Sequence, residues 1–195
     1  MRFRSLLDPI YCYRKLNYKI YELRHPDEPW IAQGAIRFCS DNLTHEDVAL
    51  EWGSGRSTLW FAQRLKALTS VEHDELWYEK ISAQIASTGI QNVSYLFRPL
   101  HHPAALTIPL SERLATPYVR VTESFSQESL DFVAIDGHYR EACILAVIPK
   151  LKTGGLLLLD NSNWLSLSEW GIPSAWRVVH QSHNVMTETT IWRKY

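Results

Sequence analysis

The stretch Val48-Ala-Leu-Glu51-Trp-Gly53-Ser-Gly55-Arg-Ser57-Thr58 decides how this chain folds. Its apolar beginning predicts a buried strand, and its polar end, from Ser57, predicts the start of a helix. Gly53 and Gly55 lie in the turn between them, where the lack of a Cβ atom frees the backbone and lets a ligand approach it closely. The stretch therefore predicts a strand, a tight turn and a helix, with a ligand-binding surface at the turn.

A carboxylate follows at the end of the next predicted strand, residues 69–72, which ends at Glu72. In an open α/β sheet the carboxyl ends of parallel strands meet at one edge, and an acidic side chain there accepts hydrogen bonds from both hydroxyls of a ribose. His73 comes directly afterwards and is expected beside the adenine. The glycine turn and Glu72 together predict a cofactor that contains adenosine, as used by dinucleotide enzymes and by S-adenosylmethionine enzymes.

Composition limits the classes of protein to consider. The chain has 195 residues, with 20 Lys and Arg against 21 Asp and Glu, so its overall charge gives no reason to expect a nucleic acid partner. No apolar run reaches the roughly 18–20 residues of a membrane span, and the first residues do not resemble a secretory signal. Cys12, Cys39 and Cys143 are expected as buried thiols in a reducing cytoplasm. We therefore expect a single cytoplasmic domain, and the sequence leaves the oligomeric state open, with a homodimer as one candidate.

The order of predicted elements is that of an α/β protein. Two helices, residues 9–23 and 29–42, belong to an N-terminal helical segment, residues 1–46, and precede a core of residues 47–195. In the core, strands 48–51, 69–72, 93–98, 131–135 and 156–159 alternate with helices 57–68, 74–86 and 138–151. Gly154 and Gly155 are expected to form the turn before strand 156–159. Alternation of this kind predicts a mostly parallel sheet with helices on both faces.

The chain closes with two further apolar runs, residues 176–180 and 189–192, which predict a terminal hairpin. The expected fold class is therefore α/β: a Rossmann-like, doubly wound, seven-stranded sheet, mostly parallel with a reversed last strand.

From residue 47 onward the chain resembles class I S-adenosylmethionine-dependent methyltransferases. Glu51-x-Gly53-x-Gly55 is similar to the first motif of that family, residues 131–138 to its fourth-strand motif and residues 154–161 to its fifth-strand motif. The resemblance implies transfer of a methyl group from S-adenosylmethionine to a small-molecule acceptor, with a hydroxyl oxygen as the expected target. The cofactor-binding residues that it implies are Glu51, Gly53, Ser54, Gly55, Ser57, Thr58, Glu72, His73 and Asp136.

Asp136, Asp160 and Asn161 resemble the divalent-metal set of catechol- and caffeoyl-CoA-type O-methyltransferases. Hard oxygen ligands of this kind suit Mg²⁺ or Ca²⁺, and a metal would lower the pKa of a bound substrate hydroxyl. A looser group of small-molecule and sugar O-methyltransferases matches about as well, in which case the same residues orient the acceptor without a metal or form a turn.

His138 and Asp136 are the predicted catalytic residues. A histidine has an unperturbed pKa near neutral pH, so His138 is the leading candidate for removing the proton of the acceptor hydroxyl. Asp136 is expected to orient the acceptor. The structural alternatives are that Asp136 caps the following helix and that His138 only supports it.

Two segments are assigned less directly. Residues 100–129, with His101 and His102, form a long connection that we expect to contain a short helix and a lid over the acceptor pocket. The N-terminal segment is basic and rich in tyrosine, with Lys15 and Lys19 among its charges. We expect it to pack on the domain with its basic tips in water, while contact with an anionic membrane surface or an anionic substrate is the alternative.

Two other functions remain open from the sequence. One is an NAD(P)-binding oxidoreductase, although Thr58 occupies the place of the third glycine of that motif. The other is a non-catalytic nucleotide-binding module with the same fold, because a fold by itself does not establish a function.

Overall fold

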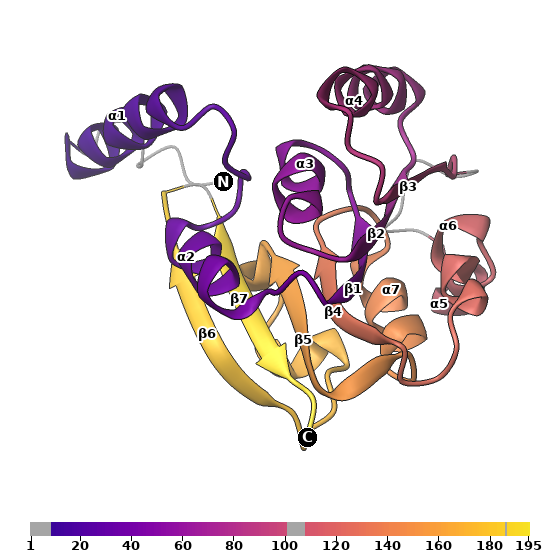
Figure 1. Cartoon of the computed structure of the whole chain (residues 1–195). Coiled ribbons are helices and arrows are strands. Elements are labelled where there is room, and N and C mark those ends of the chain that lie inside the picture. Colours follow the sequence, from indigo (N-terminus) through magenta and orange to yellow (C-terminus); the bar gives the residue numbers. More distant parts are fainter. Residues whose placement is uncertain (1–8, 101–107, 186) are drawn as a thin grey trace.

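The computed structural model describes residues 9–100, 108–185 and 187–195. Their strands form one seven-stranded sheet in the order β3-β2-β1-β4-β5-β7-β6 (Figure 1). The strands are β1 Val48–Trp52, β2 Ala67–Glu72, β3 Val93–Phe97, β4 Leu130–Ile135, β5 Leu151–Asp160, β6 Arg177–His183 and β7 Glu188–Arg193. Strands β1 to β5 run parallel to one another, whereas β7 runs antiparallel to both β5 and β6. The predicted Rossmann-like fold with a reversed last strand is confirmed.

Helices cover both faces of this sheet. They are α1 Pro9–Arg24, α2 Gln33–Asn42, α3 Arg56–Ala62, α4 Glu75–Thr88, α5 Leu110–Leu114, α6 Pro117–Arg120 and α7 Arg140–Val147. Short 3₁₀ helices, η3 Val121–Ser124, η4 Ser162–Trp164 and η5 Leu167–Trp170, complete the described elements. The helices α2 and α3 pack in one apolar cluster and α6 and α7 in another, while α4 lies against β2 and β3. None of the described helices combines the length and apolar character that crossing a membrane requires.

The central strands are apolar at nearly every position because both of their faces are buried. In β4, Phe132 and Ala134 join the cluster that contains α2 and α3, whereas Val133 and Ile135 join the cluster that contains α6 and α7. This pattern is expected where side chains alternate between two covered faces of a parallel sheet.

Several element boundaries differ from the predicted ones. The helix expected over residues 57–68 ends at Ala62, because the chain turns there to begin β2 at Ala67. Leu65 and Leu68 fit a helical period, but they are buried in the turn and in β2 instead. Gly154 and Gly155 lie inside β5, which begins at Leu151, so they do not form the turn before it.

The helix after β4 begins at Arg140 and not at His138. Tyr139 precedes it with a left-handed backbone, φ 51°, and is its N-cap residue. The alternative in which Asp136 caps this helix is therefore wrong. At the other end of the chain, the helix expected from residue 29 begins at Gln33. Of the three cysteines, Cys39 and Cys143 are buried but Cys12 is exposed, which corrects the expectation for that residue.

The expected lid lies partly outside the described residues, since it includes His101 and His102. The lid therefore stays a prediction. Tyr118 and Val119 of α6 are completely buried, and the Trp52 indole nitrogen donates a hydrogen bond to the Tyr118 carbonyl at 2.9 Å. Tyr118, Val119, Val121 and Thr122 therefore belong to the core at the carboxyl edge of the sheet.

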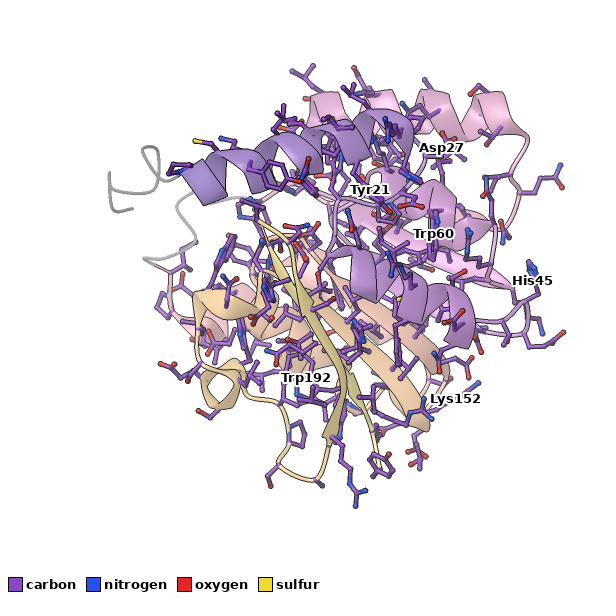
Figure 2. The ribbon with its side chains drawn as sticks, turned by 90° about the vertical axis from the view of Figure 1, so that its left-hand side faces the viewer. Tyr21, Asp27, His45, Trp60, Lys152 and Trp192 are labelled. Carbon is purple, nitrogen blue, oxygen red and sulfur yellow. The ribbon has the colours of Figure 1, made fainter. Side chains whose placement is uncertain are left out.

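The helix α1 lies beyond that carboxyl edge, above the end of β6 and the start of β7 (Figure 1). Figure 2 shows the arrangement from the side: Tyr21 of α1 lies near the top, and Lys152 and Trp192, near the start of β5 and the end of β7, lie towards the bottom. The apolar residues of α1 point away from the domain, since Leu16 is 59% and Leu23 is 81% exposed. The side of α1 that faces the domain carries Tyr18 and Glu22 together with Lys15 and Lys19, of which Lys19 is 67% exposed.

We predict that Phe132→Ala destabilises the fold by about 3–5 kcal/mol, because it removes a buried aromatic ring from the centre of the sheet. Phe132 is 1% exposed, and its ring centroid lies 5.1 Å from that of Phe61. Urea unfolding measures the change, with Leu76→Ala on the exposed surface of α4 as the control. A loss for Phe132→Ala no larger than that of the control would contradict the described packing.

Candidate active site

The turn after β1 and the turn after β4 touch each other at the carboxyl edge. Gly53 has φ 87°, and a Cβ atom added to it would lie 2.7 Å from the Gly137 backbone nitrogen. A Cβ atom on Gly137 would in turn overlap the Tyr118 hydroxyl. The Asp136 backbone nitrogen also donates to the Trp52 carbonyl at 2.9 Å. Both glycines are needed here because two backbones approach within van der Waals contact.

Glu51 is buried beneath the first of these turns. Its Oε2 accepts hydrogen bonds from the hydroxyls of Thr58 and Ser70, both at 2.6 Å. Burial raises the pKa of Glu51 to about 6, and the hydroxyls of Ser57, Ser70 and Thr58 oppose that rise. Its Oε1, although also buried, has no aligned hydrogen-bond donor among the described residues.

Two predicted cofactor-binding residues, Thr58 and Ser57, lie beside Glu51. Thr58 is completely buried and also accepts a hydrogen bond from the Gly55 backbone nitrogen at 3.0 Å. Its contacts in the structure are with Glu51, Ser70 and the glycine turn, so it holds the carboxylate in position. Ser57 lies close enough to Glu51 to lower its pKa.

Arg56, which the sequence analysis did not single out, is the first residue of α3 and directly follows the glycine turn. Its guanidinium packs over the Trp30 ring at 4.9 Å, and its buried Nη1 has no hydrogen-bond partner among the described residues. A cation in the first turn of a helix is unfavourable to the helix dipole. That placement is the signal in the sequence that could have indicated an anionic group nearby.

Glu72 ends β2 with its carboxylate fully engaged. Oε2 accepts from the Ser54 backbone nitrogen at 3.1 Å and from the Ser54 hydroxyl at 2.8 Å. Oε1 accepts from the backbone nitrogens of His73 and Asp74 at 2.8 and 2.9 Å. Burial alone would raise the pKa of Glu72, but hydrogen bonds from His73, Asp74 and Ser54 outweigh it and hold the pKa at about 2. Glu72 is therefore a fixed negative charge.

Two histidines meet beside Glu72. His73 Nδ1 lies 2.9 Å from Glu72 Oε1, but the orientation of the ring does not give an aligned hydrogen bond between these atoms. The ring centroids of His73 and His138 are 4.3 Å apart, and the His138 backbone nitrogen donates to the Tyr118 hydroxyl at 3.2 Å. Burial lowers the pKa of His138, and the charges of His73 and Arg140 lower it further. These surroundings favour the neutral form of the His138 ring.

Asp160 ends β5 with both carboxylate oxygens occupied. Oδ1 accepts from the Thr189 hydroxyl at 2.5 Å and Oδ2 from the Thr187 hydroxyl at 2.8 Å. Asn161 follows with a left-handed backbone, φ 49°, and its side-chain amide donates to the same Thr187 hydroxyl at 2.8 Å. Burial raises the pKa of Asp160, and the two threonine hydroxyls oppose the rise.

Arg140 joins the ends of β4 and β5. Its guanidinium donates to the Gly137 and Asp136 carbonyls at 2.9 Å, to Asp136 Oδ1 at 3.0 Å and to the Asp160 carbonyl. The Trp164 ring covers it at 4.5 Å. The Asp136 side chain is 41% exposed, and it lines an open recess. Burial and then the charge of Asp160 raise the pKa of Asp136, against the opposing effect of Arg140.

The structure brings the proposed metal ligands together, but they do not fit a divalent cation. Both Asp160 oxygens accept threonine hydroxyls, and Asp136 is paired with a guanidinium, which would repel a second cation. In the described parts of the chain, no group of three or more His, Cys, Asp or Glu side chains is arranged to hold a metal. The expected Mg²⁺ or Ca²⁺ site at Asp136, Asp160 and Asn161 is therefore not supported by these contacts.

A recess of about 290 Å³ opens between α1 and the carboxyl edge. The helix contributes Lys15, Tyr18, Lys19 and Glu22, and Trp30 lies beside them. The opposite wall consists of Asp136, Asp160, Asn161 and Thr187. The histidine pair lies on the other side of Asp136, towards β2, so the recess and the glycine turn occupy neighbouring parts of one edge.

Comparison with known proteins identifies the class. A family profile described as a methyltransferase domain matches residues 50–162, more than half of the chain, so the chain belongs to this family. The protein is a methyltransferase of this family. No curated protein matches the sequence.

Solved structures share the fold at low sequence identity. A methyltransferase-like protein of Silicibacter pomeroyi is 22% identical, with a TM-score of 0.59 over 86% of this chain and 89% of that one. A Streptococcus mutans protein assigned as a methyltransferase, in complex with SAH, is 11% identical, with a TM-score of 0.60 over 82% and 94%. An rRNA methylase of Streptococcus thermophilus is 13% identical, with a TM-score of 0.59 over 81% and 92%. At these identities the likeness establishes the fold alone.

We predict that Glu72→Gln weakens binding of S-adenosylhomocysteine by about 1.5–3 kcal/mol, which is roughly tenfold or more, because a charge-assisted acceptor for the ribose is lost. Isothermal titration calorimetry measures the change. Glu79→Gln, on the exposed surface of α4, is the matched control. Equal affinity for the wild type and the Glu72 variant would show that Glu72 does not hold the ribose.

Proposed function

We propose that the protein transfers the methyl group to a hydroxyl oxygen of a small molecule that binds in the recess under α1. The observation that carries this proposal is the recess itself, of about 290 Å³, at the carboxyl edge and with Asp136 in its wall. Ligands of open α/β sheets bind at this edge, and small-molecule pockets have volumes of roughly 300–1,000 Å³. A recess at the lower end of that range favours a small acceptor over an RNA segment.

The residues around the glycine turn match the charges of the cofactor. The methionine part of S-adenosylmethionine carries an ammonium and a carboxylate. The buried Glu51 Oε1 is an acceptor without a donor and the buried Arg56 Nη1 is a donor without an acceptor among the described residues. We assign the ammonium to Glu51 and the carboxylate to Arg56, since buried polar atoms of this kind are normally paired. When bound, the cofactor supplies a methyl group that its sulfonium makes electrophilic.

Glu72 is assigned to the ribose, as an anionic acceptor at the end of β2. Ser54 supplies both hydrogen bonds to Glu72 Oε2, and its hydroxyl also lies 2.5 Å from the Tyr95 hydroxyl. A ribose hydroxyl at Oε2 therefore takes the place of the Ser54 hydroxyl, which keeps Tyr95 as a partner. His73 is assigned to the adenosine side of the site.

Asp136 is the side chain best placed to accept the proton of the acceptor hydroxyl. It lines the recess, Arg140 holds its Oδ1, and its Oδ2 makes no hydrogen bond with the described residues. A raised pKa makes a carboxylate a stronger base near neutral pH. His138 was the leading candidate from the sequence, but its ring lies against His73, and it is not among the side chains that line the recess. We therefore assign His138 to the cofactor side and proton removal to Asp136.

We predict that Asp136→Asn lowers kcat about 10²–10⁴-fold while binding of S-adenosylhomocysteine is retained, because the base is lost and the cofactor site is not. Methyl transfer from labelled S-adenosylmethionine measures the rate, with an acceptor chosen by screening hydroxylated small molecules. In the wild type, the rate should rise with pH through the raised pKa of Asp136, since only the ionised carboxylate accepts a proton.

His138→Asn is the matched variant for this test. It should keep the rise of the rate with pH and change mainly the affinity for the cofactor. If His138→Asn abolishes that rise and Asp136→Asn remains active, then His138 is the base. If the wild type binds the cofactor but methylates none of the hydroxylated acceptors, the proposed O-methylation is wrong.

We also predict that chelation leaves the rate unchanged. The carboxylates of Asp136 and Asp160 are already paired with Arg140 and with threonine hydroxyls. Activity measured in EDTA should equal that in buffer alone, with added Mg²⁺ as the comparison. Loss of activity in EDTA and its recovery with Mg²⁺ would instead establish a metal-dependent enzyme.

A further inference from the structure

The helix α1 turns a polar face towards the recess. Lys15, Tyr18, Lys19 and Glu22 line it, at spacings of three and four residues that place them on one side of a helix. The opposite side of α1 carries Tyr13, Leu16, Ile20 and Leu23, all of which are exposed. A helix that is held on a domain by apolar contacts turns its apolar face to the domain and its polar face to the solvent. The polar face of α1 is thus directed at the site itself.

Among the described side chains that line the recess, Lys15 is the cation without a partner. Lys19 Nζ lies 3.0 Å from Glu22 Oε2, and Asp136 is paired with Arg140. Asp160 is satisfied by two threonine hydroxyls. Lys15, which is half-buried, makes no ion pair or hydrogen bond with the described residues. The α1 wall therefore has a surplus positive charge that faces the polar wall formed by the sheet.

We propose that the methyl acceptor carries a phosphate or carboxylate group, which binds Lys15 and Lys19 of α1 while its hydroxyl faces Asp136. This inference rests on the proposed function, since it names the class of acceptor that the same recess takes. The two walls determine the orientation of the acceptor: its anionic group binds the lysines of α1, and its hydroxyl faces the wall that contains Asp136. Lys19 can take part because its side chain is 67% exposed, so that its ion pair with Glu22 is open to solvent on the lysine side and contributes little stability.

The test uses the full chain saturated with S-adenosylhomocysteine and two pairs of probes that differ in charge. Glucose 6-phosphate is compared with glucose, and 4-hydroxybenzoate with 4-hydroxybenzyl alcohol, so the phosphate and carboxylate arms are separate. Calorimetry should give at least tenfold tighter binding for the anion in one of the two pairs. The preference should weaken as salt is raised, because partly exposed charges are screened.

The double variant Lys15→Gln/Lys19→Gln should lose the preference for the anion, and Lys15→Arg/Lys19→Arg should retain it. Lys66→Gln, an exposed lysine at the opposite edge of the sheet, is the control and should bind as the wild type does. Equal or absent binding of the anionic and neutral probes, or a preference that survives the double Gln variant, would overturn the inference. If S-adenosylhomocysteine itself does not bind, the proposed function fails and the inference fails with it, whereas normal cofactor binding without an anion preference rejects the inference alone.

Discussion

Two backbone turns are in contact at the carboxyl edge of the sheet, and the arrangement of the whole site depends on that contact. Neither Gly53 nor Gly137 could carry a side chain without displacing the other turn or Tyr118. The close approach places the end of β1 beside the end of β4, so that Glu51 and Asp136 belong to one site. It also explains why α6 is part of the core, because Tyr118 supports both turns from below.

Four carboxylates gather at this edge, and their surroundings give them different properties. Glu72 receives several N–H and O–H donors and stays ionised, whereas burial raises the pKa values of Glu51, Asp136 and Asp160. Arg140 joins two of these residues, since it donates to the backbone carbonyls of Asp136, directly after β4, and of Asp160, the last residue of β5. The Arg140 guanidinium lies beside Asp136 and Asp160, where the resemblance to metal-dependent O-methyltransferases predicted a metal ion. Its hydrogen bonds fix the ends of β4 and β5 relative to each other.

The sequence was sufficient to predict the sheet and the turns that meet at its carboxyl edge, because apolar runs and glycine turns are local signals. It predicted too long a helix after the glycine turn, since Leu65 and Leu68 fit a helical period but are buried by tertiary packing. The roles of Thr58 and α1 could not be read locally. Whether a hydroxyl faces a ligand or a buried carboxylate, and which side of a helix faces a recess, depends on elements distant in the chain. Arg56 did provide a local signal, because a cation in the first turn of a helix is unfavourable and so indicates an anionic group nearby.

A crystal structure of the protein with S-adenosylhomocysteine tests the central claim most directly. The account predicts the compound along the carboxyl edge, with its ribose hydroxyls on Glu72 and its amino and carboxylate groups within hydrogen-bond distance of Glu51 and Arg56. The Ser54 hydroxyl should then have left Glu72 Oε2. Binding of the compound elsewhere, or at this edge with Glu51 and Arg56 still unpaired and Ser54 still on Glu72, would contradict the account.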